Sequence, residues 1–112
     1  MLPETAKLLL DMKSAAERIG RFVAGKTFSD FQTDELLRSG VERQFEIIGE
    51  AMTRLIKRDP STAARISDYR KIAGFRNALA HGYDSIDDDI TWGIVTDKLP
   101  ILLRETEALL SP

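Results

Sequence analysis

The stretch from Asp34 to Arg58, DELLRSGVERQFEIIGEAMTRLIKR, decides the fold because its apolar residues follow the period of one long helix. They recur at steps of three and four residues, as Leu37, Val41, Phe45, Ile48, Met52 and Leu55. This spacing puts them on one face, which other helices have to cover. Gly40 and Gly49 each cost about 1 kcal/mol relative to alanine inside a helix, so we expect another backbone to cross closely near Gly49.

The segments before and after this stretch show the same helical pattern. Residues 4 to 24 predict a first helix with Leu9, Met12, Ala16, Ile19 and Val23 on its buried face, and Gly25 is a natural stop. Ser29 to Gln32 fits a capping box with Ser29 as the N-cap, and Thr33 to Glu35 offers a second helix start. Asp59-Pro60-Ser61 breaks the long helix, and residues 61 to 66 predict a short helical turn.

Two further helices complete the expected architecture. Ser67 is expected to cap a third helix from Asp68 to about His81, and an aspartate between Asp84 and Asp89 to cap a fourth. In the fourth helix Ile90, Ile94 and Val95 should face inward, and Pro100 should cause a kink or a restart. No convincing strand pattern occurs. The sequence therefore predicts one domain, residues 1 to 112, built as an all-α antiparallel bundle of four or five helices.

Composition excludes several classes of protein. The chain has no cysteine, which excludes disulfides and thiolate metal sites and suits a reducing, cytoplasmic location. It has no apolar run long enough for a membrane span and no basic region typical of a signal peptide. The net charge is −2, but the segment from Arg54 to Arg76 carries +5 and the remainder −7. That basic segment is either a phosphate-binding surface or an ordinary solvated helix face.

The residues with most chemical potential lie at the end of the third helix, from Phe75 to Tyr83. His81 is the only histidine, and the last turn of a helix favours its protonated ring. An imidazole with an ordinary pKa near ~6.5 suits proton transfer at neutral pH. Arg76 could hold a phosphate and stabilise charge developing on it, and Asn77 could orient the ring or the phosphate.

The spacing of these residues favours a site shared between two chains. Asn77 and His81 are four residues apart and share a helix face, whereas Arg76 and His81 are separated by about 140° around the axis. Arg76 and His81 meet only if the helix unwinds at Gly82 or if a second molecule supplies one of them. These groups suit metal-free RNA cleavage by a 2′-hydroxyl, a reaction that usually needs two acid–base groups. A two-fold homodimer would supply two copies of His81.

The segment Arg76–Tyr83, RNALAHGY, resembles the R-x4-H-x-Y motif of HepT-like toxins in the HEPN superfamily. The resemblance covers essentially the whole chain. Residues 45 to 51 resemble the second-helix signature of the family, and residues 74 to 77, 90 to 92 and 99 to 100 follow in the expected order. Two departures are Tyr69, where the family has tryptophan, and Ser67, where it often has proline; both departures concern structure.

The resemblance implies a fold, an activity and a partner. It implies a HEPN-type helical bundle, a homodimer with a composite cleft, and ribonuclease activity that uses neither metal nor cofactor. It also implies a cognate nucleotidyltransferase antitoxin of the MntA kind that transfers AMP to the motif tyrosine, Tyr83. A bulky anion two residues beyond His81 would block the cleft and repel RNA. Assembly beyond the dimer remains open.

For several residues the sequence is compatible with two roles. Arg65, Arg70 and Lys71 are candidates for RNA binding, and Tyr69 could stack on RNA or simply pack. Glu50 could approach the site or pair with Arg54 on the helix surface. The aspartates between Asp84 and Asp89 fit capping and solvation better than a metal site. Trp92 is more consistent with a core or interface anchor than with a platform for bases.

The alternative to a ribonuclease toxin is a non-catalytic HEPN module that binds a nucleotidyltransferase partner or a nucleotide. A purely structural helical dimer would leave the grouping of arginine, histidine and tyrosine without a role.

Overall fold

The computed structural model describes the backbone of residues 1–81 and 88–111, and side chains for residues 1–75 and 88–111. The elements along the chain are α1 (Pro3–Val23), α2 (Phe28–Thr33), α3 (Glu35–Arg58), α4 (Pro60–Ala63), α5 (Tyr69–His81), α6 (Asp88–Gly93), the π-helical turn η1 (Ile94–Lys98) and α7 (Leu99–Leu110). No strand occurs in these ranges, which confirms the all-α prediction. No helix of the described residues has the length and apolarity that a membrane crossing requires.

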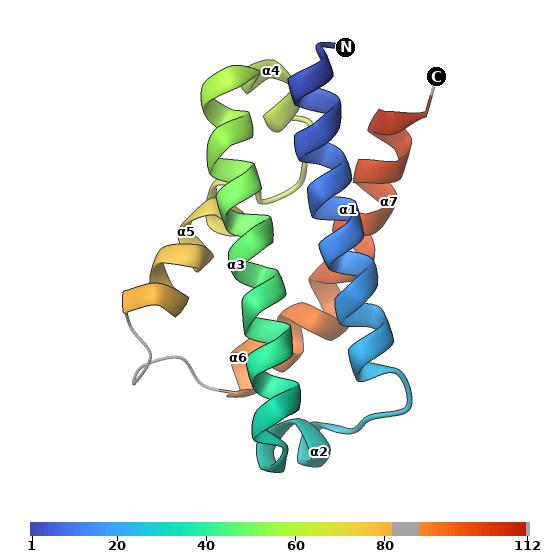
Figure 1. Cartoon of the computed structure of the whole chain (residues 1–112), viewed down its shortest axis with the longest axis vertical. Helices are drawn as coiled ribbons and strands as arrows, with labels where there is room; N and C mark the ends of the chain where they lie inside the picture. The colour runs from blue at the N-terminus through green and yellow to red at the C-terminus, as the bar shows by residue number, and fades with distance from the viewer. Residues whose placement is uncertain (82–87, 112) are drawn as a thin grey trace.

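Three long helical segments form the body of the bundle. Helix α3 runs antiparallel to α1, and the segment from α6 to α7 also runs antiparallel to α1 (Figure 1). Helix α5 lies against α3 on the side away from α1 (Figure 1). The two ends of the chain lie near the same end of the bundle (Figure 1).

The core confirms the helical periodicity that the sequence predicts. All six apolar positions predicted on the long helix are buried in α3, and so are Leu9, Met12, Ala16 and Ile19 of α1. Burying side chains of this size contributes about 1.5–3 kcal/mol each relative to leaving them exposed. Trp92 packs on Phe31, with ring centroids 5.3 Å apart, and Phe31 itself is fully buried. Trp92 is therefore a packing residue, as expected.

Helix ends differ in detail from the sequence-based expectations. Thr27, not Ser29, caps α2: it accepts a hydrogen bond from the Asp30 backbone N–H, and the Asp30 carboxylate accepts one from the Thr27 N–H. Threonine and serine are both common N-cap residues, and here Thr27, two residues before Ser29, takes this position. Asp34 caps α3, which confirms the predicted second start. At the end of α1, Gly25 has φ +73°, a backbone conformation suited to glycine.

The expected cap at Ser67 is wrong. Its backbone N–H and its hydroxyl both donate to the carboxylate of Glu105 on α7, at 3.0 and 2.9 Å. A partner 38 residues away in the sequence could not be inferred from local capping rules. The contact ties the segment before α5 to the last helix.

The last helical segment contains the irregularity that Pro100 predicts. The Leu99 N–H donates to the Ile94 carbonyl, five residues back, so the turn before Pro100 is a π turn rather than an α turn. Proline has no N–H to donate and crowds the preceding turn, which explains a defect at this place. The expectation that Ile90 faces inward is wrong: its side chain is 54% exposed, and Thr91 and Val95 are the buried residues.

The close backbone crossing expected near Gly49 stays a prediction, and the other glycine of the long helix contacts a side chain of α1. Gly49 is buried, but a Cβ atom built on Gly40 would lie 3.4 Å from the ring of Phe22 on α1. Such a distance is an ordinary van der Waals contact, so a Cβ atom would fit at position 40 against the ring of Phe22.

A partly buried hydrogen bond joins the first helix to the turn after α3. The carboxylate of Asp59 caps α4 by accepting from the Thr62 N–H and hydroxyl, and it also accepts from Ser61. Thr5 of α1, which is fully buried, donates its hydroxyl to the same carboxylate at 3.0 Å. Hydrogen bonds from Thr62 and then Thr5 lower the pKa of Asp59 below its ordinary value of 3.8.

This network predicts an acid-sensitive contribution to stability. A lowered carboxyl pKa stabilises the fold above the pKa of the unfolded chain, and the contribution disappears as pH falls through the folded-state pKa. Asp59→Asn should therefore lower the Tm most at pH 7, and its difference from wild type should shrink as pH falls below about 4. Circular dichroism melts between pH 7 and pH 2.5 measure this. A difference that stays constant over this range would contradict the role of the charge.

Candidate functional site

The backbone places the predicted catalytic segment in the last two turns of α5. Arg76, Asn77 and His81 all lie within the helix, which extends to His81. Their side chains lie outside the described residues, and so does Tyr83, the predicted modification site. Because α5 is helical up to His81, the positions of Arg76 and His81 are about 140° apart around its axis, whereas Asn77 and His81 share a face.

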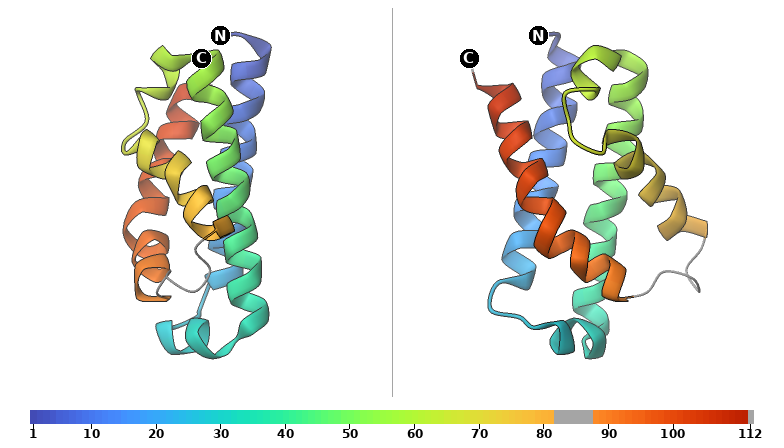
Figure 2. Two further views of the ribbon diagram at one scale, coloured as in Figure 1. Left: turned by 90° about the vertical axis from the view of Figure 1, so that its left-hand side faces the viewer. Right: turned by 180° about the vertical axis from the view of Figure 1, so that it is seen from behind.

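Helix α5 leaves the body of the bundle at its C-terminal end. It begins close to α3, and its last turn lies away from α3 in Figure 1 and in the right view of Figure 2. The ring of Phe75, the residue before Arg76, packs edge-on against Phe45 of α3 with centroids 5.5 Å apart. This contact fixes the helix immediately before the motif. The motif residues therefore begin where α5 leaves the bundle surface.

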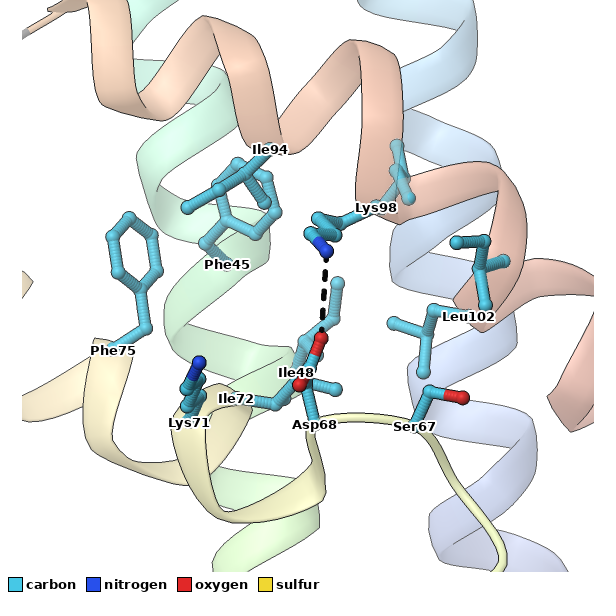
Figure 3. A pocket seen from close by; sticks show the side chains of 12 residues that line it. Phe45, Ile48, Ser67, Asp68, Lys71, Ile72, Phe75, Ile94, Lys98 and Leu102 are labelled. Carbon is cyan, nitrogen blue, oxygen red and sulfur yellow. Dashed lines mark ion pairs between the residues drawn. The ribbon is translucent and has the colours of Figure 1, made fainter.

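A cleft of about 200 Å³ lies beside α5, between α3 and the η1–α7 segment (Figure 3). Its walls are mostly apolar and include Phe45, Ile48, Ile72, Phe75, Ile94 and Leu102. The π turn contributes to one wall, because Ile94 and Lys98 both belong to η1. Clefts of this kind, apolar with a few convergent polar groups, are typical of ligand sites.

The polar residues that line the cleft are two lysines, one aspartate and Ser67. Lys71 comes from α5 and Lys98 from η1, and the Lys98 ammonium pairs with the Asp68 carboxylate at 3.6 Å (Figure 3). Asp68 has φ +57°, a conformation that asparagine and aspartate tolerate better than most residues. Both partners are largely exposed, 61% for Lys98 and 44% for Asp68, so the pair is weak and replaceable. The sequence analysis did not identify the pair of Lys98 and Asp68, because no local sequence pattern links the two residues.

The three candidate RNA-binding residues are not in equivalent places. Lys71 lines the cleft. Arg70 instead folds back on its neighbour: its Nε donates to the Tyr69 hydroxyl at 3.1 Å, and its guanidinium lies 5.5 Å from the centre of that ring. Arg65 is exposed in the connection between α4 and α5. Of the three, Lys71 is thus the residue that the fold places in a concave surface.

Glu50 pairs with Arg54 on the helix surface, which was one of the two roles expected from the sequence. Its carboxylate pairs with Arg54 at 3.0 Å on the exposed surface of α3. It also lines a shallow depression with Leu8 and Asp11 of α1, rather than the cleft beside α5. Arg58 pairs similarly with Glu4, so part of the basic segment is compensated by surface carboxylates.

Glu42 is a titratable group that the sequence did not single out. Partial burial raises its pKa above the ordinary value, and the negative charge of Asp88 at the start of α6 raises it further. Arg38 opposes this shift by favouring the charged form. No local pattern could have revealed this, because Asp88 lies 46 residues further along the chain.

Metal chemistry has no candidate centre in the described part of the chain. Among these residues, no three histidine, cysteine, aspartate or glutamate side chains gather closely enough to hold an ion. The last turns of α5, whose sequence holds Arg76, Asn77 and His81, follow directly after Phe75, which lines the cleft with the two lysines.

The fold therefore defines the class of an all-helical bundle with a polar sequence motif in the last turns of one helix. A family described as ribonuclease HepT-like matches residues 12–109, and this chain belongs to that family. No solved structure gives a significant match.

Two relatives illustrate how closely the chain resembles named members. It is 31% identical over 99 residues to a protein of Methanocaldococcus jannaschii named Putative RNase MJ1380, covering 88% of this chain and 90% of the relative. It is 33% identical over 104 residues to Probable ribonuclease HepT of Thermococcus cleftensis, covering 90% and 91%. The similarity therefore extends over nearly the whole length of both relatives.

Proposed function

We propose that this protein is a metal-independent ribonuclease toxin whose active site forms between two copies of the chain. The observation that carries the proposal is the R-x4-H-x-Y segment at the free end of α5, in a chain of the ribonuclease HepT-like family. The names of the relatives support RNA as the substrate. The acidic chain as a whole is compatible with this because the segment from Arg54 to Arg76 carries a net charge of +5.

The proposed reaction is an internal transfer at a phosphate of RNA. The 2′-oxygen attacks the adjacent phosphorus and loses its proton, while the bond from phosphorus to the 5′-oxygen breaks and that oxygen gains a proton. The products are a 2′,3′-cyclic phosphate and a 5′-hydroxyl. His81 is the acid–base group, Arg76 binds the phosphate and stabilises its developing charge, and Asn77 orients the reacting groups.

The register of α5 supports a site built by two chains. Arg76 and His81 lie about 140° apart around a helix that is regular up to His81, so one chain does not bring them to the same face. A second α5 related by a two-fold axis would place the His81 of one chain near the Arg76 of the other. It would also supply the second imidazole that acid–base catalysis at two oxygens needs.

We further propose that a nucleotidyltransferase encoded beside this protein silences it by adding AMP to Tyr83. Tyr83 follows His81 by two residues, so an added phosphate would place negative charge close to the RNA path. Such a charge would repel substrate phosphates and occupy space that the substrate needs.

Co-expression tests the toxin and its partner together. Expression of this chain alone should arrest bacterial growth, and co-expression with the neighbouring nucleotidyltransferase should restore growth. The intact mass of the co-expressed protein should then increase by whole multiples of adenylate, and the increase should disappear in Tyr83→Phe. Growth that is unaffected by the chain alone would favour a non-catalytic module, and a mass increase retained by Tyr83→Phe would place the modification elsewhere.

A further inference from the structure

The cleft beside α5 has the chemistry of a nucleotide-sized site. The rings of Phe45 and Phe75 and the side chain of Ile94 lie close together at one end, and Lys98 and Asp68 lie beside them (Figure 3). Lys71, one helical turn before Phe75 on α5, also borders the cleft. An apolar, partly aromatic end beside cationic groups matches a molecule with a flat base and a phosphate.

The position of the cleft connects it with the proposed cleavage site. Phe75 lines the cleft and is followed directly by Arg76, the proposed phosphate-binding residue. The backbone of the proposed phosphate-binding residue therefore lies directly after a residue that lines the cleft. The π turn is part of the same arrangement because it supplies both Ile94 and Lys98.

We propose that the cleft binds one nucleotide of the single-stranded RNA substrate, next to the cleaved phosphate. Its base packs against Phe45 and Phe75, and its phosphate lies between Lys71 and Lys98. This inference rests on the proposed ribonuclease function. Asp68 acts as a competitor in the absence of RNA, because its carboxylate pairs with Lys98 at 3.6 Å and must give way to the phosphate.

The charge complementarity favours RNA over a second copy of the chain as occupant. Lys71 and Lys98 present two positive charges at the mouth, against one carboxylate from Asp68. The groove is also concave and narrow, with a volume of about 200 Å³, which suits one flat group better than a helix face. The experiments must therefore distinguish binding of RNA in the cleft from occupation of the cleft by a second copy of the chain.

Binding of a 2′-O-methyl oligoribonucleotide, which lacks the attacking hydroxyl and cannot be cleaved, tests the charged groups independently of catalysis. By fluorescence anisotropy, Lys98→Gln and Lys71→Gln should each weaken binding roughly threefold. Each should also make the slope of log affinity against log salt less negative by about 0.7, the value for one phosphate contact on a single strand. The control Lys26→Gln, an exposed lysine in the connection between α1 and α2, should leave the slope unchanged.

The variant Asp68→Asn is expected to strengthen RNA binding, whereas misfolding would weaken it. Asparagine tolerates the φ of +57° at this position, but it no longer neutralises Lys98. The variant should bind the oligoribonucleotide roughly threefold more tightly than wild type. Unchanged or weaker binding by Asp68→Asn, or salt slopes equal to wild type in both lysine variants, would overturn the proposal.

Fluorine NMR of protein labelled with 4-fluorophenylalanine locates the base. Addition of the oligoribonucleotide should shift the Phe45 and Phe75 resonances and leave that of Phe22, on α1, unchanged. RNA binding without those shifts would overturn the cleft while leaving the ribonuclease proposal intact. Shifts that depend on protein concentration instead of RNA would assign the cleft to a second copy. Conversely, the expected shifts in a protein that cleaves no RNA would support the cleft and refute the proposed activity.

Discussion

His81→Ala is expected to lower kcat/KM for RNA cleavage by at least ~100-fold, the lower limit for loss of a positioned acid–base group. Arg76→Ala should cause a loss of ~100- to 1,000-fold, because the charge developing on the phosphate loses its main partner. Both variants should also lose the ability to arrest growth. Cleavage of a fluorescently labelled single-stranded RNA by purified protein measures these effects.

The controls separate catalysis from folding. Both replaced residues lie at the end of α5, beyond the contact between Phe75 and Phe45 that fixes this helix, so the Tm should change little. Arg21→Ala, which removes an exposed arginine in the last turn of α1, should cleave RNA like wild type. Equal cleavage by His81→Ala and wild-type protein would refute the assigned role of the imidazole.

Mixed dimers provide the second large effect. If one cleft needs His81 from both chains, only dimers with two wild-type chains are active. Equal amounts of wild-type and His81→Ala chains, unfolded together and refolded to random pairs, should then retain about one quarter of the wild-type activity. Mixing the same two proteins after separate folding, before subunits exchange, should retain about half.

The outcome of the mixing experiment distinguishes three arrangements. Activity of about one half after random pairing would mean that each site needs only one His81, whether its arginine comes from the same chain or from the partner. Activity clearly above one half would mean that a single imidazole in a cleft shared by both chains is sufficient, with another group completing the proton transfers. Either result would contradict a site that depends on a pair of His81 side chains.

Much of the fold could be predicted because it depends on periodicity within single helices. The buried positions of α3 follow from steps of three and four residues, and Gly25 and Asp34 mark helix boundaries by local backbone rules. Such signals depend on residues a few positions apart, which is the range over which sequence patterns are informative. Pro100 likewise predicts an irregularity, although not its form as a π turn.

The features that escaped prediction depend on partners far away in the sequence. Thr5 reaches Asp59, and Ser67 reaches Glu105 instead of capping α5. Ile90 looks like a core residue by type, yet it is exposed and its neighbour Thr91 is buried, whereas the prediction that Val95 faces inward is confirmed. Tertiary packing determines which of these residues are buried and which long-range hydrogen bonds form, and local sequence rules do not predict either.

The candidate site divides in the same way. The motif from Arg76 to Tyr83 is contiguous, so sequence alone could identify it, and the family assignment agrees with that identification. The cleft beside it could not be predicted, because Phe45, Lys71 and Lys98 come from three separate elements. The structure therefore reveals a cleft beside a motif that could already be identified from the sequence.

The central claim is that this chain cuts RNA through its own side chains, with the 2′-hydroxyl of the substrate as the nucleophile. The most direct test is incubation of wild-type and His81→Ala protein with RNA in EDTA, followed by analysis of the new ends. We predict cleavage by wild type that leaves 2′,3′-cyclic phosphate and 5′-hydroxyl ends, and none by His81→Ala. Cleavage that requires added divalent metal, or that leaves 5′-phosphate ends, would contradict this mechanism.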